Sequence, residues 1–424
     1  MTMTMEGAAE TEVIDGGGGG AAIGHVPGFR VAGVACGIRK SGHLDLALIA
    51  SDGPCAAAGV FTTNCVKAAP VLLDQARLAR NAGGIRAVVV NSGVANACTG
   101  DQGMADAVET AVSVAGALGC APEDVLVLST GVIGVPLPMA RIRAGVRAAA
   151  QSLTPHGWAD AADTRPKQAA VQVETAQGTY TIAGIAKGAG MIAPNMATML
   201  AVIATDAALD PPTLQGALRA ATAVSFNQIV VDGDMSTNDT VLALASGASG
   251  IPVVTSATRE TFTAGLTAVC TALAKAIVRD GEGASRFITL HVTGAPDEES
   301  ARQVAMAVAT SPLVKTAFYG GDANWGRILA AAGRAGVPLD ADRLALWFAP
   351  GEQGVGPGSN GTGGWLGMVA GGVPTNYREE DAAAALAGGS VSVRLDLGLG
   401  QAASTVWTCD LSQEYVTING HYRT

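Results

Sequence analysis

Short runs of aliphatic residues alternate along this chain with Ala-rich segments, and this alternation limits the folds that the chain can adopt. Arg86–Asn91 and Asp124–Ser129 are rich in β-branched and aliphatic residues and end in Gly-containing turns, which predicts buried strands. Met104–Leu118, between them, is Ala-rich and predicts a helix. Tyr180–Ala186 and Met199–Ala204 predict two more strands. The pattern indicates an α/β protein of layered strands and helices.

One long amphipathic segment lies in the second half of the chain. Thr258–Val278 predicts a helix, because apolar residues recur at three- and four-residue spacing: Phe262, Leu266, Val269, Leu273 and Ile277. Asp280 and Gly281 end this helix, and Ser285–Val292 predicts a strand. The Gly-rich stretch Gly351–Gly372 is typical of a loop or a disordered insertion.

The composition sets the size of the core and restricts the partners. The chain has 424 residues, more than one average domain, so two lobes are expected. Hydrophobic residues make up 49% and charged residues 15%, which excludes global disorder. Aromatic residues are only 4%, so small aliphatic side chains must fill the interior. The formal net charge of −10 opposes binding to nucleic acid or to anionic membranes.

Residues 1–24 are expected to form a flexible Gly-rich tail. The stretch contains the glycine run Gly16–Gly20 and lacks the basic and apolar regions of a signal peptide. Apolar runs such as Met199–Ala204 are much shorter than the roughly 20 residues that a membrane-spanning helix needs. We therefore expect a cytoplasmic protein that is not attached to a membrane.

Cysteine, histidine and acidic residues do not predict a metal centre. The seven cysteines are dispersed without a C-x-x-C pair, which indicates reduced thiols, and the five histidines show no metal-ligand spacing. Asp232, Asp234 and Asp239 suggest a calcium loop. An EF-hand is rejected because Thr237 and Ala243 stand where Gly and Glu are needed, so these acids are expected to organise a polar turn. We expect neither a metal nor an organic cofactor.

The segment Lys187–Leu200, KGAGMIAPNMATML, is the most informative in the chain. Its portion Gly188–Ala193 matches the dinucleotide-binding pattern G-x-G-x-x-A, which requires a helix to begin there. Pro194 and Asn195 interrupt such a helix at once, and an apolar strand follows Thr198, so nucleotide binding is disfavoured. The local pattern alone fits a Gly-rich turn between two strands equally well.

This segment resembles the self-processing segment of the ornithine acetyltransferase (glutamate N-acetyltransferase) family, and the resemblance covers nearly the whole chain after the tail. Five further blocks match in the same order: Asn91–Gly100 (NSGVANACTG), Leu128–Gly134 (LSTGVIG), Val231–Thr240 (VDGDMSTNDT), Gly321–Ala331 (GDANWGRILAA) and Ile418–Thr424 (INGHYRT). Because all of these blocks match in the same order along the chain, the resemblance is specific. It implies an N-terminal-nucleophile-like α/β (α+β) fold of layered mixed sheets flanked by helices, with a smaller C-terminal lobe.

The resemblance implies that Thr198 is a nucleophile, exposed when the chain cuts its own Ala197–Thr198 bond. Cleavage would give an alpha chain, residues 25–197 after the tail, and a beta chain, residues 198–424. A threonine hydroxyl needs a base to remove its proton. The freed α-amino group, with a reference pKa of about 7.7–8.0, suits that role near neutral pH. Taken alone, Thr198 fits an ordinary β-branched residue beside an apolar run.

The resemblance also implies an oxyanion hole formed by the Thr130 side chain and the Gly131 backbone N–H. Both residues follow the strand predicted to end at Ser129, where backbone N–H groups can point into a cleft. Each well-placed donor contributes roughly 3–4 kcal/mol to acyl transfer. From spacing alone, a strand-terminating turn with Thr130 in a local hydrogen bond fits better.

Four further residues are implied to bind substrate. Lys187 is suited to pair with a substrate carboxylate, and Glu282 to hold an amine. Asn419 and Thr424 match the C-terminal binding pair of the family. Each of them also fits a solvated surface residue or a local hydrogen bond, Glu282 most of all.

One stretch departs from the family pattern. Ala161 and Ala162 precede Asp163 where the family usually carries a Thr-Thr pair, and the run before them is shortened. A family substrate-binding threonine therefore has no counterpart, and this departure is expected to weaken or alter substrate binding while leaving the nucleophile intact.

The implied reaction moves an acetyl group from N2-acetylornithine to glutamate through an acetyl-Thr198 intermediate, giving ornithine and N-acetylglutamate in arginine biosynthesis. Some family members also accept acetyl-CoA. Two alternatives stay open: a self-processing amidohydrolase or aminopeptidase, and a non-processing binding protein on the same scaffold. The alpha and beta fragments are expected to stay associated, as a heterotetramer of two alpha and two beta chains.

Overall fold

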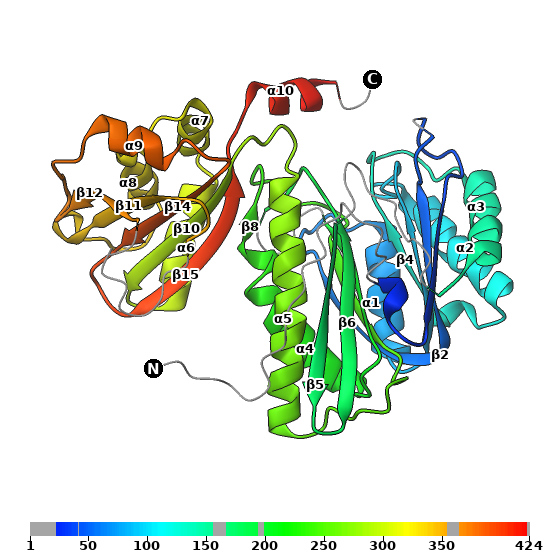
Figure 1. Cartoon of the computed structure of the whole chain (residues 1–424). Helices are drawn as coiled ribbons and strands as arrows, with labels where there is room; N and C mark the ends of the chain where they lie inside the picture. Colours follow the sequence, from blue (N-terminus) through cyan, green and yellow to red (C-terminus); the bar gives the residue numbers. More distant parts are fainter. Residues whose placement is uncertain (1–22, 41, 156–166, 194–198, 354–363, 422–424) are drawn as a thin grey trace. The chain divides into compact units, whose positions relative to one another are not determined.

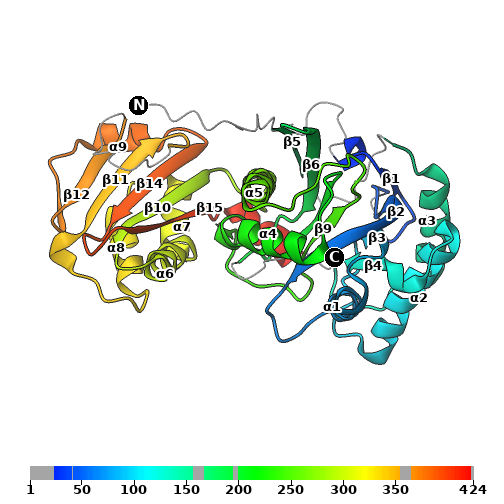
Figure 2. The same ribbon diagram turned by 90° about the horizontal axis from the view of Figure 1, so that it is seen from below.

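The computed structural model describes residues 23–40, 42–155, 167–193, 199–353 and 364–421. It divides the chain into two compact units, whose elements are labelled in Figures 1 and 2. The first unit comprises residues 1–227 and 234–277, and the second comprises residues 228–233 and 278–424. Both units combine mixed sheets with flanking helices, as the α/β prediction requires.

In the described part of the chain, the first unit is built on one eight-stranded sheet. Its strands are β1 (Phe29–Val34), β2 (Leu46–Phe61), β3 (Ile85–Asn91), β4 (Val125–Ser129), β5 (Lys167–Thr175), β6 (Gly178–Lys187), β7 (Leu200–Thr205) and β9 (Thr240–Ala245). The order is β4-β3-β2-β9-β7-β6-β5, and β1 also pairs with β2. The pairs β3–β4 and β7–β9 are parallel, and the others are antiparallel.

The long strand β2 folds this sheet over on itself. Its first half pairs with β1 and β3, whereas its second half, Ala56–Phe61, pairs with β9. Val88 and Leu126 from one half of the sheet share a buried cluster with Val202 and Leu242 from the other half. The two halves therefore pack face to face, and helices cover their outer sides.

The helices of the first unit are α1 (Ala69–Asn81), α2 (Gly100–Leu118), α3 (Met139–Ser152), α4 (Pro211–Ala223) and α5 (Ser256–Arg279). Ala87 and Val89 of β3 share a second buried cluster with α2 and α3, while Val88 and Val90 join the inner cluster. Because β3 is buried on both faces, its sequence shows no alternation of polar and apolar residues. On the other side, α5 lies along β5 and β6 (Figure 1), where Gly265 allows close contact.

Helix α1 covers the edge strand β4. The Asp74 carboxylate accepts a hydrogen bond from the Val127 N–H at 2.9 Å, and the Arg77 guanidinium donates to the Val125 carbonyl. Burial raises the pKa of Asp74 well above its usual range, and the Val127 N–H and Arg77 act to lower it. Because side chains occupy the free backbone groups of this edge, the strand cannot pair with another chain.

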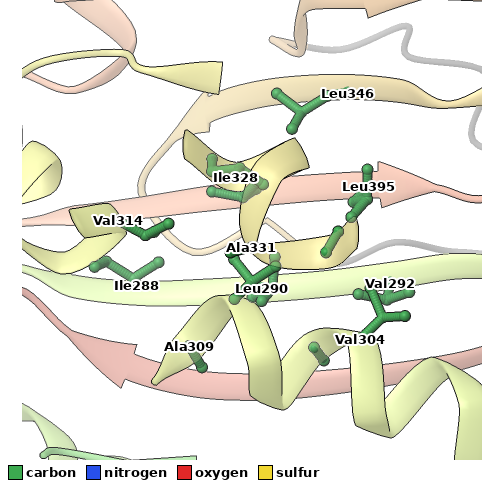
Figure 3. Packing of buried hydrophobic residues seen from close by; sticks show 14 of the residues in the cluster. Ile288, Leu290, Val292, Val304, Ala309, Val314, Ile328, Ala331, Leu346 and Leu395 are labelled. Carbon is green, nitrogen blue, oxygen red and sulfur yellow. The ribbon is translucent and has the colours of Figure 1, made fainter. Parts of the chain in front are cut away.

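The second unit has a seven-stranded mixed sheet in its described residues. Its strands are β8 (Ile229–Val230), β10 (Phe287–Ala295), β11 (Ala345–Pro350), β12 (Leu366–Ala370), β13 (Val373–Pro374), β14 (Ser390–Asp396) and β15 (Ala402–Cys409), in the order β13-β12-β11-β14-β10-β15-β8. Its helices are α6 (Glu298–Ala309), α7 (Pro312–Gly320), α8 (Trp325–Gly333), α9 (Glu379–Ala385) and α10 (Gln413–Gly420). Leu290 and Val292 of β10 share one buried cluster with Val304 and Ala309 of α6 (Figure 3).

The predicted strands and helices are confirmed, with small changes at their ends. The helix predicted at Thr258–Val278 is α5, and the helix predicted to begin at Met104 begins at Gly100. By length and composition alone α5 could cross a membrane, and half of its most apolar stretch is buried inside the protein.

The prediction of a loop or disordered insertion across Gly351–Gly372 is wrong for Leu366–Ala370. This segment is strand β12, which pairs with β11. Met368 and Val369 are fully buried in the core of the second unit, and the abundant glycines around them obscured this short apolar run. Residues 354–363 lie outside the described part of the chain.

Candidate active site

Four strand ends meet at one place in the first unit. β6 ends at Lys187, which pairs with Leu200 at the start of β7, and Leu200 pairs with Thr240 at the start of β9. The Lys187 ammonium donates a hydrogen bond of 2.7 Å to the Thr130 hydroxyl, directly after β4. Both side chains are buried, with relative exposures of 8% and 3%. Residues from both halves of the folded sheet are thereby brought together.

The turn after β4 requires glycine at position 131. Its φ is +130°, and a Cβ there would lie 2.2 Å from the carbonyl carbon of Gly93. The Thr130 N–H donates to the Asn91 carbonyl at 3.0 Å, and the Val132 N–H donates to the Gly93 carbonyl at 3.2 Å. Within the described residues, the Gly131 N–H between them donates to no acceptor. This donor is therefore available to a developing oxyanion.

The bond from Lys187 determines what the Thr130 hydroxyl can do. An ammonium group can only donate, so Thr130 Oγ1 is the acceptor and its own proton is directed elsewhere. The hydroxyl is thus left as a donor next to the Gly131 N–H, with a positive charge behind it, which is the arrangement that an oxyanion needs. In the structure the Lys187 side chain is hydrogen-bonded to Thr130. The expected pairing of Lys187 with a substrate carboxylate stays a prediction.

Asn238, just before β9, ties the elements of the site together. Its Nδ2 donates to the Ala95 carbonyl at 2.7 Å and to the Ser129 carbonyl at 2.8 Å, so it joins β9 to the ends of β3 and β4. The sequence reasoning did not single out this residue. The available signal was a run of polar residues that continues directly into the fully buried strand Thr240–Ala245.

Asp239 is fully buried beside the start of β7. Its Oδ1 accepts a hydrogen bond from the Met199 N–H at 3.0 Å, while among the described residues its Oδ2 has no hydrogen-bond partner. Burial raises the pKa of Asp239 well above its usual range, and the Met199 N–H, Ser236, Thr62 and the Lys187 charge act to lower it.

Ala197, Thr198 and Thr424 lie outside the described residues, so their predicted roles stay predictions. The neighbour of Thr198 is described: Met199 is buried, and its carbonyl accepts a hydrogen bond of 3.1 Å from the Thr240 N–H. Met199, the residue that follows Thr198 in the sequence, therefore lies where the four strand ends meet, and the role of Thr198 there stays a prediction.

In the second unit the structure brings Glu282 and Asn419 together. Asn419, on α10, donates through Nδ2 to Glu282 Oε2 at 2.8 Å. α10 is held near by Ser412, whose hydroxyl donates to the Gly283 carbonyl at 2.6 Å. These contacts show that Glu282 and Asn419 are neighbours, and their role in substrate binding stays a prediction.

Comparison with known proteins places the whole chain in one family. The ArgJ family model matches residues 30–424. Two relatives, both called arginine biosynthesis bifunctional protein ArgJ, are 51% identical to the chain. The protein from Symbiobacterium thermophilum aligns over 94% of this chain and 97% of its own length, and that from Geobacter sulfurreducens over 94% and 100%. A solved ornithine acetyltransferase from Mycobacterium tuberculosis, complexed with ornithine, is 42% identical and covers 43% of this chain and 98% of its own, with a TM-score of 0.39. The chain therefore belongs to the ArgJ family.

Proposed function

We propose that this protein transfers an acetyl group from N2-acetylornithine to glutamate through an acetyl-Thr198 intermediate. Membership of the ArgJ family makes it an acyltransferase, and the curated relatives act in arginine biosynthesis. The single observation that carries the proposal is the hydrogen bond from Lys187 to Thr130, beside a Gly131 N–H that donates to no acceptor among the described residues. It leaves two donors for an oxyanion close to Leu200, the first residue of β7, which lies two positions after Thr198 in the sequence.

The reaction is a double displacement. The Thr198 hydroxyl gives its proton to the α-amino group of the same residue while its oxygen attacks the acetyl carbonyl, and the resulting oxyanion is stabilised by Thr130 and Gly131. Collapse breaks the amide bond, and the ammonium returns the proton to the departing ornithine amine. The glutamate amine then attacks the acetyl ester, and Thr198 regains its proton as N-acetylglutamate leaves.

The same hydroxyl would first cut the precursor. Attack on the Ala197 carbonyl converts the peptide bond to an ester, and water then releases the Ala197 carboxylate and the Thr198 amine. β7 follows this bond and pairs with β6, which precedes it, so the alpha and beta fragments would share one sheet and stay associated. We propose that two such pairs form the heterotetramer, and that acetyl-CoA is a second acetyl donor, in keeping with the bifunctional relatives.

An acceptor assay tests the proposed reaction. The purified protein is incubated with N2-acetylornithine, with and without glutamate, and ornithine and N-acetylglutamate are measured. We expect both products to appear in equal amounts, and ornithine release to be slow without glutamate, because water is a poor competitor for a site built to bind an amino acid. Equal rates of ornithine release with and without glutamate would favour a self-processing amidohydrolase instead.

A further inference from the structure

The peptide group between Ser129 and Thr130 is held at both of its ends. Its N–H, which belongs to Thr130, donates to the Asn91 carbonyl at 3.0 Å. Its carbonyl, which belongs to Ser129, accepts a hydrogen bond of 2.8 Å from Asn238 Nδ2. The α-carbon of Thr130 joins this rigid peptide to the next one, which carries the Gly131 N–H. The direction of that N–H and of the Thr130 hydroxyl therefore depends on how firmly the first peptide is held.

The Asn238 amide is itself held in one orientation. Its side chain is buried, with a relative exposure of 4%, and Nδ2 also donates to the Ala95 carbonyl at 2.7 Å. Carbonyl oxygens only accept hydrogen bonds, so the carbonyls of Ala95 and Ser129 require the NH₂ group of the amide at this place. On the other side, Oδ1 accepts a hydrogen bond of 2.6 Å from the Thr237 hydroxyl. Both ends of the amide are thus engaged.

Asn238 joins the two segments that meet at Gly131. A Cβ at position 131 would lie 2.2 Å from the Gly93 carbonyl carbon, so the turn after β4 is in direct contact with the loop after β3. Backbone bonds connect them as well: the Val132 N–H donates to the Gly93 carbonyl at 3.2 Å, and the Ala95 N–H to the Val132 carbonyl at 3.0 Å. Asn238 bonds both segments from a third one, just before β9. A shift of the turn against the loop would break one of these bonds.

We propose that Asn238 is the positioning residue for the oxyanion hole, which its amide holds in shape by fixing the peptide between Ser129 and Thr130. This inference rests on the proposed function. In this role Asn238 touches no substrate, and it gains and loses no proton. Donors that already point at the developing charge need not reorganise during the reaction, and a misplacement of about 1 Å costs about 100-fold in rate.

Replacement of Asn238 by Leu tests this role without adding a charge. Leu keeps the branch at Cγ but can donate to neither carbonyl, so the turn after β4 loses its side-chain support. We expect kcat, expressed per cleaved molecule, to fall about 100-fold. KM for N2-acetylornithine should change by less than about threefold, because the oxyanion is formed only in the transition state.

An anionic tetrahedral inhibitor gives a second readout. N2-(methylphosphonyl)ornithine carries a charged phosphoryl oxygen in place of the acetyl carbonyl oxygen, so it resembles the oxyanion. In Asn238→Leu its inhibition constant should rise by about the factor by which kcat/KM falls, whereas the inhibition constant of ornithine should stay the same. A general loss of packing would weaken both inhibitors. Equal changes for the two inhibitors, or no change for either, would overturn the positioning role.

Gln215 offers a matched control in the same unit. It lies on α4, and its amide bonds the N–H and the carbonyl of Gly59 on β2, each at 3.1 Å. Gln215→Met therefore also removes two hydrogen bonds between a side-chain amide and the backbone. It should lower the free energy of unfolding but leave kcat and both inhibition constants unchanged. The same loss of kcat in Gln215→Met and Asn238→Leu would show that the effect is not specific to the turn.

Replacement of Thr237 by Val gives a milder test if Asn238→Leu does not fold or is not cleaved. It removes the hydroxyl that orients Asn238 Oδ1 and leaves both carbonyl bonds possible. We expect kcat to fall roughly 3–10-fold, the effect of one hydrogen bond, again with a weaker phosphonyl inhibitor and unchanged ornithine binding. Unchanged kcat and unchanged affinity for the phosphonyl inhibitor in Thr237→Val would contradict the positioning role.

The wild-type protein separates this inference from the proposed function. If the cleaved wild-type protein forms no N-acetylglutamate from N2-acetylornithine and glutamate, the proposed function fails. If it does form this product, and the Asn238 and Thr237 variants behave like Gln215→Met, only the positioning role fails.

Discussion

Replacement of Thr198 by Ala is expected to leave the precursor in one piece and to abolish acetyl transfer. Both events use the same hydroxyl, first against the Ala197 carbonyl and then against the acetyl carbonyl of the substrate, so removing one oxygen atom stops both. Loss of a covalent nucleophile in a working site lowers kcat on the order of 10⁶-fold. A denaturing gel and an assay of ornithine release measure the two effects on one preparation.

Thr198→Ser is the control for this prediction. Serine keeps the hydroxyl and the α-amino group, so it should still be cleaved and should keep part of the activity. A Thr198→Ala protein that is still cut at the same bond would contradict the mechanism. A wild-type protein that remains a single intact band during prolonged incubation would support the binding-protein alternative.

Replacement of Gly131 by Ala is expected to have the second largest effect. The backbone at this position has a φ of +130°, and the new Cβ would meet Gly93 at 2.2 Å, on a carbonyl carbon that cannot move aside as a side chain can. Backbone strain and the clash together should lower the free energy of unfolding by about 3 kcal/mol or more. The turn would also shift, and with it the Gly131 N–H, so kcat should fall by roughly 10²–10³-fold.

Replacement of Gly134 by Ala separates the effect of backbone strain from the effect of the clash with Gly93. Gly134 lies in the same turn region and also has a positive φ, +79°, but a Cβ there would meet nothing within 4 Å. This variant should lose only the roughly 1–2 kcal/mol of the backbone conformation and keep its activity. Urea unfolding gives the stabilities, and steady-state kinetics gives kcat. Equal effects of the two substitutions would show that the contact with Gly93 is unimportant.

The strands and helices of this protein could be predicted because each has a strong local pattern. The β-branched run at 86–91 and the apolar spacing in 258–278 are both visible without tertiary information. The folding of the sheet at β2 could not be predicted, because Leu46–Phe61 remains one continuous strand although polar residues interrupt it at Ser51 and Asp52. Only the shared cluster between the two halves reveals that they face each other.

The candidate site was predicted only in part, for a similar reason. The resemblance in short sequence blocks pointed to Thr130, Gly131 and Lys187. The structure shows the hydrogen bond from Lys187 to Thr130 and the close approach of Gly131 to Gly93. Asn238 and Asp239 act through partners more than 30 residues away in sequence, such as Ala95 and Met199. No local pattern distinguishes such residues from the polar turn in which they lie.

The proposed fragments and the compact units divide the chain differently. The unit boundaries fall at 227–234 and 277–278, whereas the proposed cut at 197–198 lies inside the first unit, between β6 and β7. A cut at that place releases an N-terminus within a folded sheet rather than separating two domains. This is the arrangement that a nucleophile with its own α-amino group as base requires.

The N-terminal sequence and mass of the C-terminal fragment test the proposed mechanism most directly. Freshly purified protein is separated on a denaturing gel, and the fragment that carries the chain end is sequenced and weighed. The mechanism predicts a fragment that begins Thr198-Met199-Leu200 and has the mass of residues 198–424. A fragment that begins at any other residue, or an intact chain with full acetyltransferase activity, would contradict it.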